Sequence, residues 1–435
     1  MSVSAAILLA ASTAFASVPS DVEEFTLSNG IRVITRQTTS ANEGFAVFLE
    51  GGSRMLDEET TGIENLAFEA CLMGSARYPG ETWRSLMDVT QARIEGVYGY
   101  DFSAIRLMCL EEDLPELLDA VSDCLIHPEL EPAAFERTRD GLLQTLLIEE
   151  SDPDERIWRV ANEGLFEGHP YRFHPSGTVE TMSGFSAGDV ESHLENRLLA
   201  GNMLISHVGP TGADDLGEIL EGTFGRIAPG GGDLTPPPPF TIARDTVIFQ
   251  PESTATAYIV GKFPAPSPSD PDYPFFTSAM DVVSDRFWQV LRTERGLTYA
   301  PFAGAASSMR NWAYFYASTP EAAEACSLMA AIMLDGADGG FSEGDLAGTL
   351  EVARTRRLMS LSSPYNQAYM LGMYRIQTGD WRNLWIYGDI ARDMDPAMLG
   401  EVLTRWLGPI SWGLVGDPGV CAPVLSSPPS LMEER

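Results

Sequence analysis

The chain has 435 residues, of which 44% are apolar and 21% charged, so it can bury a large core and is longer than one domain usually is. Its 62 acidic and 28 basic residues give a net charge of −34, which disfavours nucleic acid and anionic lipid as partners. We interpret this charge first as a means of solubility, and attraction of basic peptides or of a basic partner is the alternative.

The first 20 residues carry no charged side chain, and residues 5–10 form a short apolar run. The small residues Ala14 and Ala16 flank Phe15 in the pattern that signal peptidase recognises. We therefore predict a secretory signal peptide over residues 1–16, and a periplasmic or secreted protein without a membrane span after cleavage. Because the usual basic start is missing, a retained short anchor is the alternative, although the run is short for a membrane span.

Residues 30–35 and 45–49 have the β-branched and apolar composition of strands. A polar turn follows, and residues 62–75 then form a predicted helix. Its apolar side chains repeat at helical spacing, which is typical of a helix packed on a core. These side chains are Leu66, Ala67, Phe68, Cys71 and Leu72.

Residues 62–75 resemble the pattern G-x-x-H-x-x-E-H-x-x-x-x-G-T of the insulinase and mitochondrial-processing-peptidase (pitrilysin-like) family of metallopeptidases. In that motif two histidines bind zinc, and the glutamate between them takes a proton from zinc-bound water. The three positions are Asn65, Phe68 and Glu69 here. The family's third ligand is a glutamate 76 residues after the second histidine, and that position is Thr145. The resemblance therefore implies a chain with neither zinc ligands nor a general base, and so without a cofactor of its own.

Nearby carboxylates are the alternative source of a metal site. Glu64, Glu69, Glu149 and Glu150 could together supply oxygen ligands. A hydrolytic zinc site normally uses imidazole nitrogens, however, and Phe68 cannot act as a base. We favour a packed helix over an atypical metal site.

Further along, the close histidines His169 and His174 are each followed by proline, which favours a structural role in a loop over metal binding. Ser186 can cap a helix over residues 187–199, and Asp395 can cap another over residues 397–406. Strand composition returns at residues 313–317. No nucleophile elbow, Walker A motif or dinucleotide fingerprint is present.

Residues 228–245 are rich in glycine and proline and cannot continue a helix or a central strand. Weak sequence echoes recur about 210 residues apart on either side of this segment. We predict an N-terminal domain over residues 17–227, a linker over 228–245 and a C-terminal domain over 246–435. The fold class that we expect, and that the resemblance also implies, is α+β with two homologous α/β domains, each a sheet covered by helices.

Residues 291–299 are similar to the family's second signature, L-R-x-x-x-G-L-x-Y. The resemblance implies that Arg292 holds the substrate backbone and that Tyr299 donates to the oxyanion at a zinc site in the other half or in another chain. The alternative is that Arg292 pairs with Glu294 or with a helix end and that Tyr299 is an ordinary strand residue. Family members often carry glycines before this segment, whereas residues 281–287 contain none, so a glycine-rich substrate loop is not expected.

The five cysteines are scattered, lack C-x-x-C spacing and lie mostly in apolar surroundings, so we expect buried free thiols, and one bridge in an exported protein is the alternative. The first functional hypothesis is a non-catalytic subunit of a heterodimeric zinc metallopeptidase, inactive alone. A zinc-bearing sister subunit would be its partner, and unstructured peptides would be the substrate. The alternatives are a structural or peptide-binding homologue with no role in hydrolysis, and an autonomous metallopeptidase with an atypical metal site.

Overall fold

The computed structural model describes residues 18–432, so the predicted signal peptide over residues 1–16 lies outside the described residues. In the first half the strands are β1 (Val22–Thr26), β2 (Arg32–Gln37), β3 (Asn42–Glu50), β4 (Arg93–Tyr98), β5 (Phe102–Leu110) and β6 (Met203–Gly209). The helices of this half are α2 (Ile63–Cys71), α3 (Gly80–Thr90), α4 (Leu114–Ile126), α5 (Pro132–Ser151), α6 (Pro153–Leu165), α7 (Val179–Gly184), α8 (Ala187–Arg197) and α9 (Ala213–Gly222).

In the second half the strands are β7 (Thr246–Pro251), β8 (Ala257–Ala265), β9 (Phe302–Ala305), β10 (Asn311–Thr319) and β11 (Ser411–Gly416). The helices are α10 (Tyr273–Phe287), the π-helix η6 (Trp288–Glu294), α11 (Ala322–Ala337), α12 (Glu343–Leu361), α13 (Pro364–Thr378), α14 (Asn383–Ile390), α15 (Pro396–Trp406) and α16 (Pro418–Ser426). Short 3-10 turns join some of these elements.

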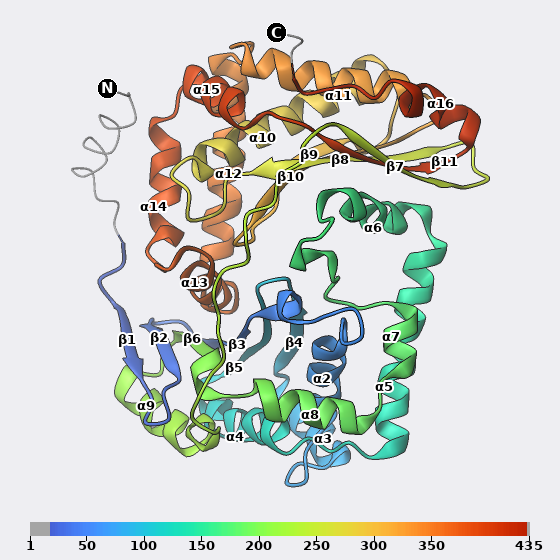
Figure 1. Cartoon of the computed structure of the whole chain (residues 1–435). Coiled ribbons are helices and arrows are strands. Elements are labelled where there is room, and N and C mark those ends of the chain that lie inside the picture. The colour runs from blue at the N-terminus through green and yellow to red at the C-terminus, as the bar shows by residue number, and fades with distance from the viewer. Residues whose placement is uncertain (1–17, 433–435) are drawn as a thin grey trace.

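The two sheets share one strand order. The first sheet runs β1-β2-β6-β3-β5-β4 and the second runs β7-β11-β8-β10-β9. When β1 is set aside, the strands correspond one to one. The single parallel pair, β2 with β6, matches β7 with β11, and the remaining pairs are antiparallel in both sheets. The predicted fold class, two α/β units with helix-covered sheets, is confirmed (Figure 1).

Each sheet is buried on both faces, because each half lends one helix to the other. Helix α13 of the second half packs on β3, β5 and β6 of the first sheet, while α6 of the first half packs on β7, β8 and β11 (Figure 1). Buried side chains fill both contacts: Leu371 lies in one cluster with Phe48, and Ile157 lies in another with Val260. The continuous apolar run at residues 45–49 follows from this, since both faces of β3 are covered.

Residues 228–245 form neither helix nor strand, and side chains hold part of this segment in place. The donors come from Arg54, His169 and Arg310, and the acceptors are the carbonyl oxygens of Leu234, Thr235, Pro237 and Pro238. The contact between His169 Nε2 and the Pro238 oxygen is 2.8 Å long, and it gives His169 the structural role predicted from the sequence. The connection between the halves is therefore a fixed strap.

Two helix caps predicted from the sequence are confirmed. Ser186 caps α8 and Asp395 caps α15, each by accepting a backbone N–H of the first turn. Predicted strands at 30–35 and 313–317 fall on β2 and β10 with shifts at their ends. Within residues 18–432 no helix is both long enough and apolar enough to cross a bilayer.

Candidate functional site

Helix α2 carries the motif positions, and its start is fixed by a close contact between two glycines. Gly62, the residue before the helix, has φ of +91°, a conformation that favours glycine. A Cβ on Gly62 would lie 2.7 Å from Cα of Gly177. The Thr61 hydroxyl also donates a hydrogen bond to the carbonyl oxygen of His174, which lies 2.9 Å away in the loop at residues 173–178. This loop therefore sets where α2 begins.

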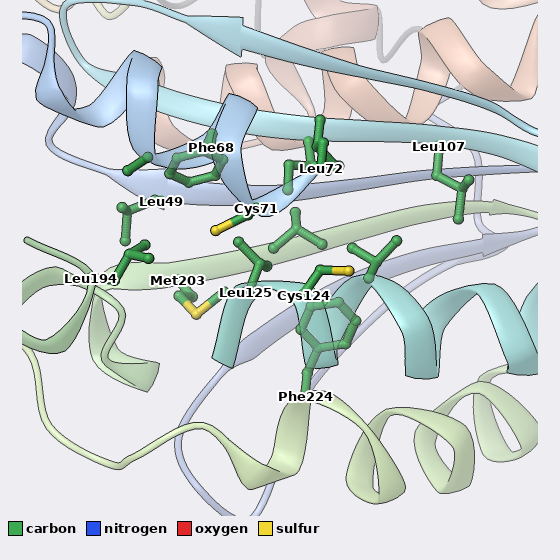
Figure 2. Close-up of a cluster of buried hydrophobic side chains, with 14 of the residues drawn as sticks. Leu49, Phe68, Cys71, Leu72, Leu107, Cys124, Leu125, Leu194, Met203 and Phe224 are labelled. Atoms are coloured by element: carbon green, nitrogen blue, oxygen red, sulfur yellow. The ribbon is translucent and has the colours of Figure 1, made fainter. Parts of the chain in front are cut away.

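Phe68, at the position of the general base, belongs to the hydrophobic core. Its side chain is only 1% exposed, and it lies with Leu49, Cys71 and Leu72 in the main cluster of the first half (Figure 2). Its ring meets Tyr98 edge-on at a centroid distance of 6.4 Å. An aromatic ring in this environment neither binds a metal ion nor accepts a proton.

Asn65 and Glu69 replace the two histidines, and neither is arranged as a zinc ligand. Asn65 is 7% exposed, and its amide oxygen Oδ1 is buried without a hydrogen-bond partner among the described residues. The carboxylate of Glu69 accepts the hydroxyl of Tyr98 at 2.7 Å. Burial, together with this carboxylate, raises the pKa of Tyr98, so the phenol remains protonated and continues to donate to Glu69.

Thr145, the position that the sequence spacing gives for the family's third ligand, lines the same hollow as Glu69. The hollow has a volume of about 540 Å³, and α5 provides one of its walls. Thr145 Oγ1 donates to the Gly141 carbonyl at 3.2 Å, within its own helix. Arg84, Arg137 and Glu129 also line the hollow, together with apolar side chains such as Leu142. The structure thus brings Glu69 and Thr145 together, whereas Asn65 and Phe68 are not among the lining residues.

Glu64 and Glu149, two of the carboxylates considered as replacements, are engaged elsewhere. Glu64 accepts the Ser103 hydroxyl and lies 3.4 Å from His193 on α8, and Glu149 accepts Arg159 at 2.9 Å. Between residues 18 and 432 no group of three or more histidine, cysteine, aspartate or glutamate side chains is placed to hold a metal ion. With an apolar ring at Phe68 and a hydroxyl at Thr145, the residues do not fit zinc.

Arg292 and Tyr299 lie in the second half, and they contact each other directly. Arg292 is on the π-helix η6, where its guanidinium carbon sits 3.9 Å from the ring centre of Trp288 and 4.5 Å from that of Tyr299. Tyr299 is 77% exposed. Arg292 forms no ion pair with a carboxylate of residues 18–432, so the proposed pair with Glu294 is absent there. The guanidinium therefore lies against two aromatic rings and has no carboxylate partner among the described residues.

Two family models match this chain. The model described as insulinase (peptidase family M16) matches residues 32–170, and the model described as peptidase M16 inactive domain matches residues 184–352. Together these matches span well over half of the sequence. The chain belongs to peptidase family M16.

Proteins similar to this M16 chain include an inactive-domain protein and subunits of larger complexes. Subunit 1 of the cytochrome b-c1 complex of Caenorhabditis elegans is 24% identical over 49% of this chain and 45% of its own length. The mitochondrial-processing peptidase subunit beta of the same organism is 21% identical over 47% and 45%. The matched region thus spans less than half of these relatives. A peptidase M16 inactive domain from Pseudomonas fluorescens has the same fold, with a TM-score of 0.84, 14% identity and coverage of 91% of this chain and 98% of that one.

Two neighbours of the predicted site residues, His193 and Trp288, are not predicted from the sequence. His193 approaches Glu64 from α8, and nothing in the sequence of α2 points to it. Trp288 was missed as well, although an aromatic residue four positions before Arg292 is a recognisable signal for stacking on a helix. The five cysteines are buried and unbridged, as predicted, and Cys71 and Cys124 lie in the same core as Phe68 (Figure 2).

Proposed function

We propose that this M16 chain is the non-catalytic subunit of a heterodimeric peptidase whose zinc-bearing sister performs hydrolysis. The observation that carries the proposal is Phe68, an aromatic core residue at the position of the general base in an otherwise retained M16 frame. The hollow beside Glu69 and Thr145 persists without ligands for zinc. The chain alone is then expected to be inactive, while its surface helps to enclose the substrate of the sister.

In this proposal Arg292 and Tyr299 act in trans. The guanidinium, braced by two rings, would hold the backbone of an extended peptide, and the exposed Tyr299 hydroxyl would donate to the oxyanion formed on the scissile carbonyl. A neutral phenol and a fixed cation stabilise developing negative charge best where water is excluded, and the sister subunit would provide that closure. The substrate class is an unstructured peptide, and the net charge of −34 favours basic sequences.

The predicted signal peptide over residues 1–16 supports export, so we place this complex in a periplasm or outside the cell. The sister subunit would then carry its own export signal. Fractionation of cells that express the full chain tests this: the processed protein is expected in the exported fraction, and full-length protein in the cytoplasm would contradict it.

The main experiment compares the purified chain alone with the chain mixed with a candidate sister that carries H-x-x-E-H. Zinc content and cleavage of an unstructured peptide are measured for each. We expect no bound zinc and no cleavage for the chain alone, with cleavage in the mixture. Stoichiometric zinc or cleavage by the chain alone would refute the proposal.

Within the active mixture, Tyr299→Phe is expected to lower kcat by about a hundredfold, because one donor to the oxyanion is removed. Arg292→Gln is expected to weaken substrate binding. Arg295→Gln is the matched control, since Arg295 is exposed on the same segment and pairs with Glu324 at 3.7 Å. Unchanged turnover for Tyr299→Phe would remove that residue from the mechanism.

A structural role without hydrolysis is the second candidate, and the match to a subunit of the cytochrome b-c1 complex favours it. It predicts a stable assembly in which the partner also lacks zinc ligands. Co-purification of the tagged chain from its own host distinguishes the two candidates by the partner's sequence and by its zinc content.

A further inference from the structure

Lys262 is the single lysine of this chain, and the other 27 of its 28 basic residues are arginines. It lies on β8, in the middle of an apolar strand, with a side chain only 3% exposed. Lysine differs from arginine in one decisive way, because its amine can lose the proton in a protein whereas a guanidinium cannot. A single buried lysine in an arginine-only chain therefore calls for a role that needs a titratable amine.

The amine of Lys262 lies in the contact between the two halves. Its Nζ donates to the side-chain oxygen of Asn162 on α6, the helix that the first half lends to the second sheet. Nζ also lies 5.4 Å from the ring centre of Trp158 and 6.0 Å from that of Trp312. No ion pair joins Lys262 to any carboxylate of residues 18–432. When charged, the amine is thus stabilised only by one amide oxygen and two ring faces.

The other titratable groups around Lys262 keep one state near neutral pH. Burial, with the nearby charges of Arg159 and Lys262, lowers the pKa of His174 to about 3, so that ring is neutral. Burial raises the pKa of Tyr100, which is hydrogen-bonded to Asn162, and of Tyr314, the strand neighbour of Lys262. Arg159 remains charged and is paired with Glu149. Among these groups Lys262 is the one whose pKa lies near neutrality; Asp281, whose charge acts on Tyr314 and whose pKa burial raises to about 6, lies on α10.

We propose that Lys262 is a proton-controlled contact between the two halves: the neutral amine lets α6 dock on the second sheet, and its protonation loosens α6. Burial lowers the pKa of Lys262 from 10.5 to about 7, which supports this. Because the folded-state pKa is depressed, the cost of a buried charge is fully present below pH 7 and disappears as pH rises towards 10.5. Docking of α6 therefore strengthens as pH rises through neutrality.

Loosening of α6 would reach the candidate site through Arg159. Its guanidinium donates to the carbonyl oxygen of Gly177 at 2.9 Å and to Glu149, which is on the same helix as Thr145. Gly177 is also the residue that packs against Gly62 at the start of α2. The protonation state of the Lys262 amine is thereby connected to α2 and α5, the helices that carry Glu69 and Thr145. This inference goes beyond the proposed function and needs no sister subunit.

The first test uses the single lysine as its own probe. In the full chain labelled with ¹³C and ¹⁵N in lysine only, one side-chain Cε signal is expected, and its chemical shift is followed from pH 5 to pH 11. We expect a titration midpoint near 7. A midpoint near the ordinary value of 10.5 would overturn the proposal.

The second test measures backbone hydrogen exchange of α6, corrected for intrinsic rates, at pH 6 and pH 8.5. If opening of α6 exposes Lys262 fully, pKa values of 7 and 10.5 give about thirtyfold more opening at pH 6. Lys262→Met, always neutral, is expected to lose this dependence, and Lys262→Arg, always charged, to exchange fast at both pH values. Helix α13, which packs on the first sheet as α6 packs on the second, is the internal control. Its hydrogen exchange is expected to change neither with pH nor in the Lys262 variants.

An equal response of α6 and α13, or a response that survives in Lys262→Met, would overturn the proposal. Should Lys262→Arg fail to fold, the comparison of the natural chain with Lys262→Met decides it alone. Neither result depends on zinc or on cleavage, so failure here leaves the proposed function standing.

Discussion

Replacement of Phe68 by alanine tests whether the position of the general base has become part of the core. A buried aromatic ring keeps roughly 150 Å² or more away from water. At about 25 cal/mol per Å² this is a loss of about 4 kcal/mol, within the range of about 3–5 kcal/mol for core Phe→Ala changes. Because Phe68 is almost fully buried against Tyr98 and Leu72, little collapse of the cavity is expected. The assay is guanidinium denaturation followed by far-UV circular dichroism.

Val89→Ala on α3 is the control, since Val89 is 80% exposed and its loss should change the free energy of unfolding by less than about 0.5 kcal/mol. Phe68→Glu restores a glutamate at the position of the general base. It should lower the free energy of unfolding more than Phe68→Ala does, because it also buries a carboxylate without a partner. A loss below about 1 kcal/mol for Phe68→Ala would refute the core assignment. Equal stability of Phe68→Glu and the natural chain would refute it as well.

Three further predictions follow from buried groups elsewhere. Burial alone would raise the pKa of Glu43, but hydrogen bonds from His207 and Thr211 hold it below 4.5. The ionised Glu43 carboxylate therefore stabilises the fold above pH 4.5, and this stabilisation is lost as pH falls through the folded-state pKa. Urea unfolding should show that Glu43→Gln costs about 3 kcal/mol or more at pH 7, with a smaller difference at pH 3. Gly372→Ala should weaken docking of α13 by about 1–3 kcal/mol, seen as a lower urea midpoint, because the new Cβ would lie 2.1 Å from the Phe48 ring. Finally, burial raises the pKa of all five cysteine thiols, so none should react with Ellman's reagent until denaturant is added; fast reaction of the native protein would contradict their burial.

Much of the first half's site could be predicted because its signals are local or fixed in spacing. The spacing that predicts Thr145 leads to the wall of the hollow that Glu69 also lines, since both positions lie on helices of the M16 fold. Phe68 was correctly read as a core residue from helical periodicity alone. Capping residues gave helix starts for the same reason: Ser186 acts within one turn of its helix.

Other features depend on contacts between distant segments, and these the sequence does not reveal. The amphipathic pattern of α6 indicates that one face of this helix is buried. It does not indicate that this face covers the sheet of the other half. Helix α10 continues into the π-helix η6, and no residue type indicates that change of helix type. Lys262 is not among the residues predicted from the sequence, and its neighbours Asn162 and Trp158 come from α6 and are identified only in three dimensions.

The exchange of α6 and α13 has a consequence for synthesis on the ribosome. Domains usually fold in order as the chain emerges, but the first sheet here waits for a helix that begins at residue 364. Until then the apolar face that includes Phe48 stays bare, while α6 has no sheet to cover. The nascent first half therefore exposes this apolar face until α13 has been synthesised. A gene cut at the strap would yield two fragments that become soluble only when expressed together.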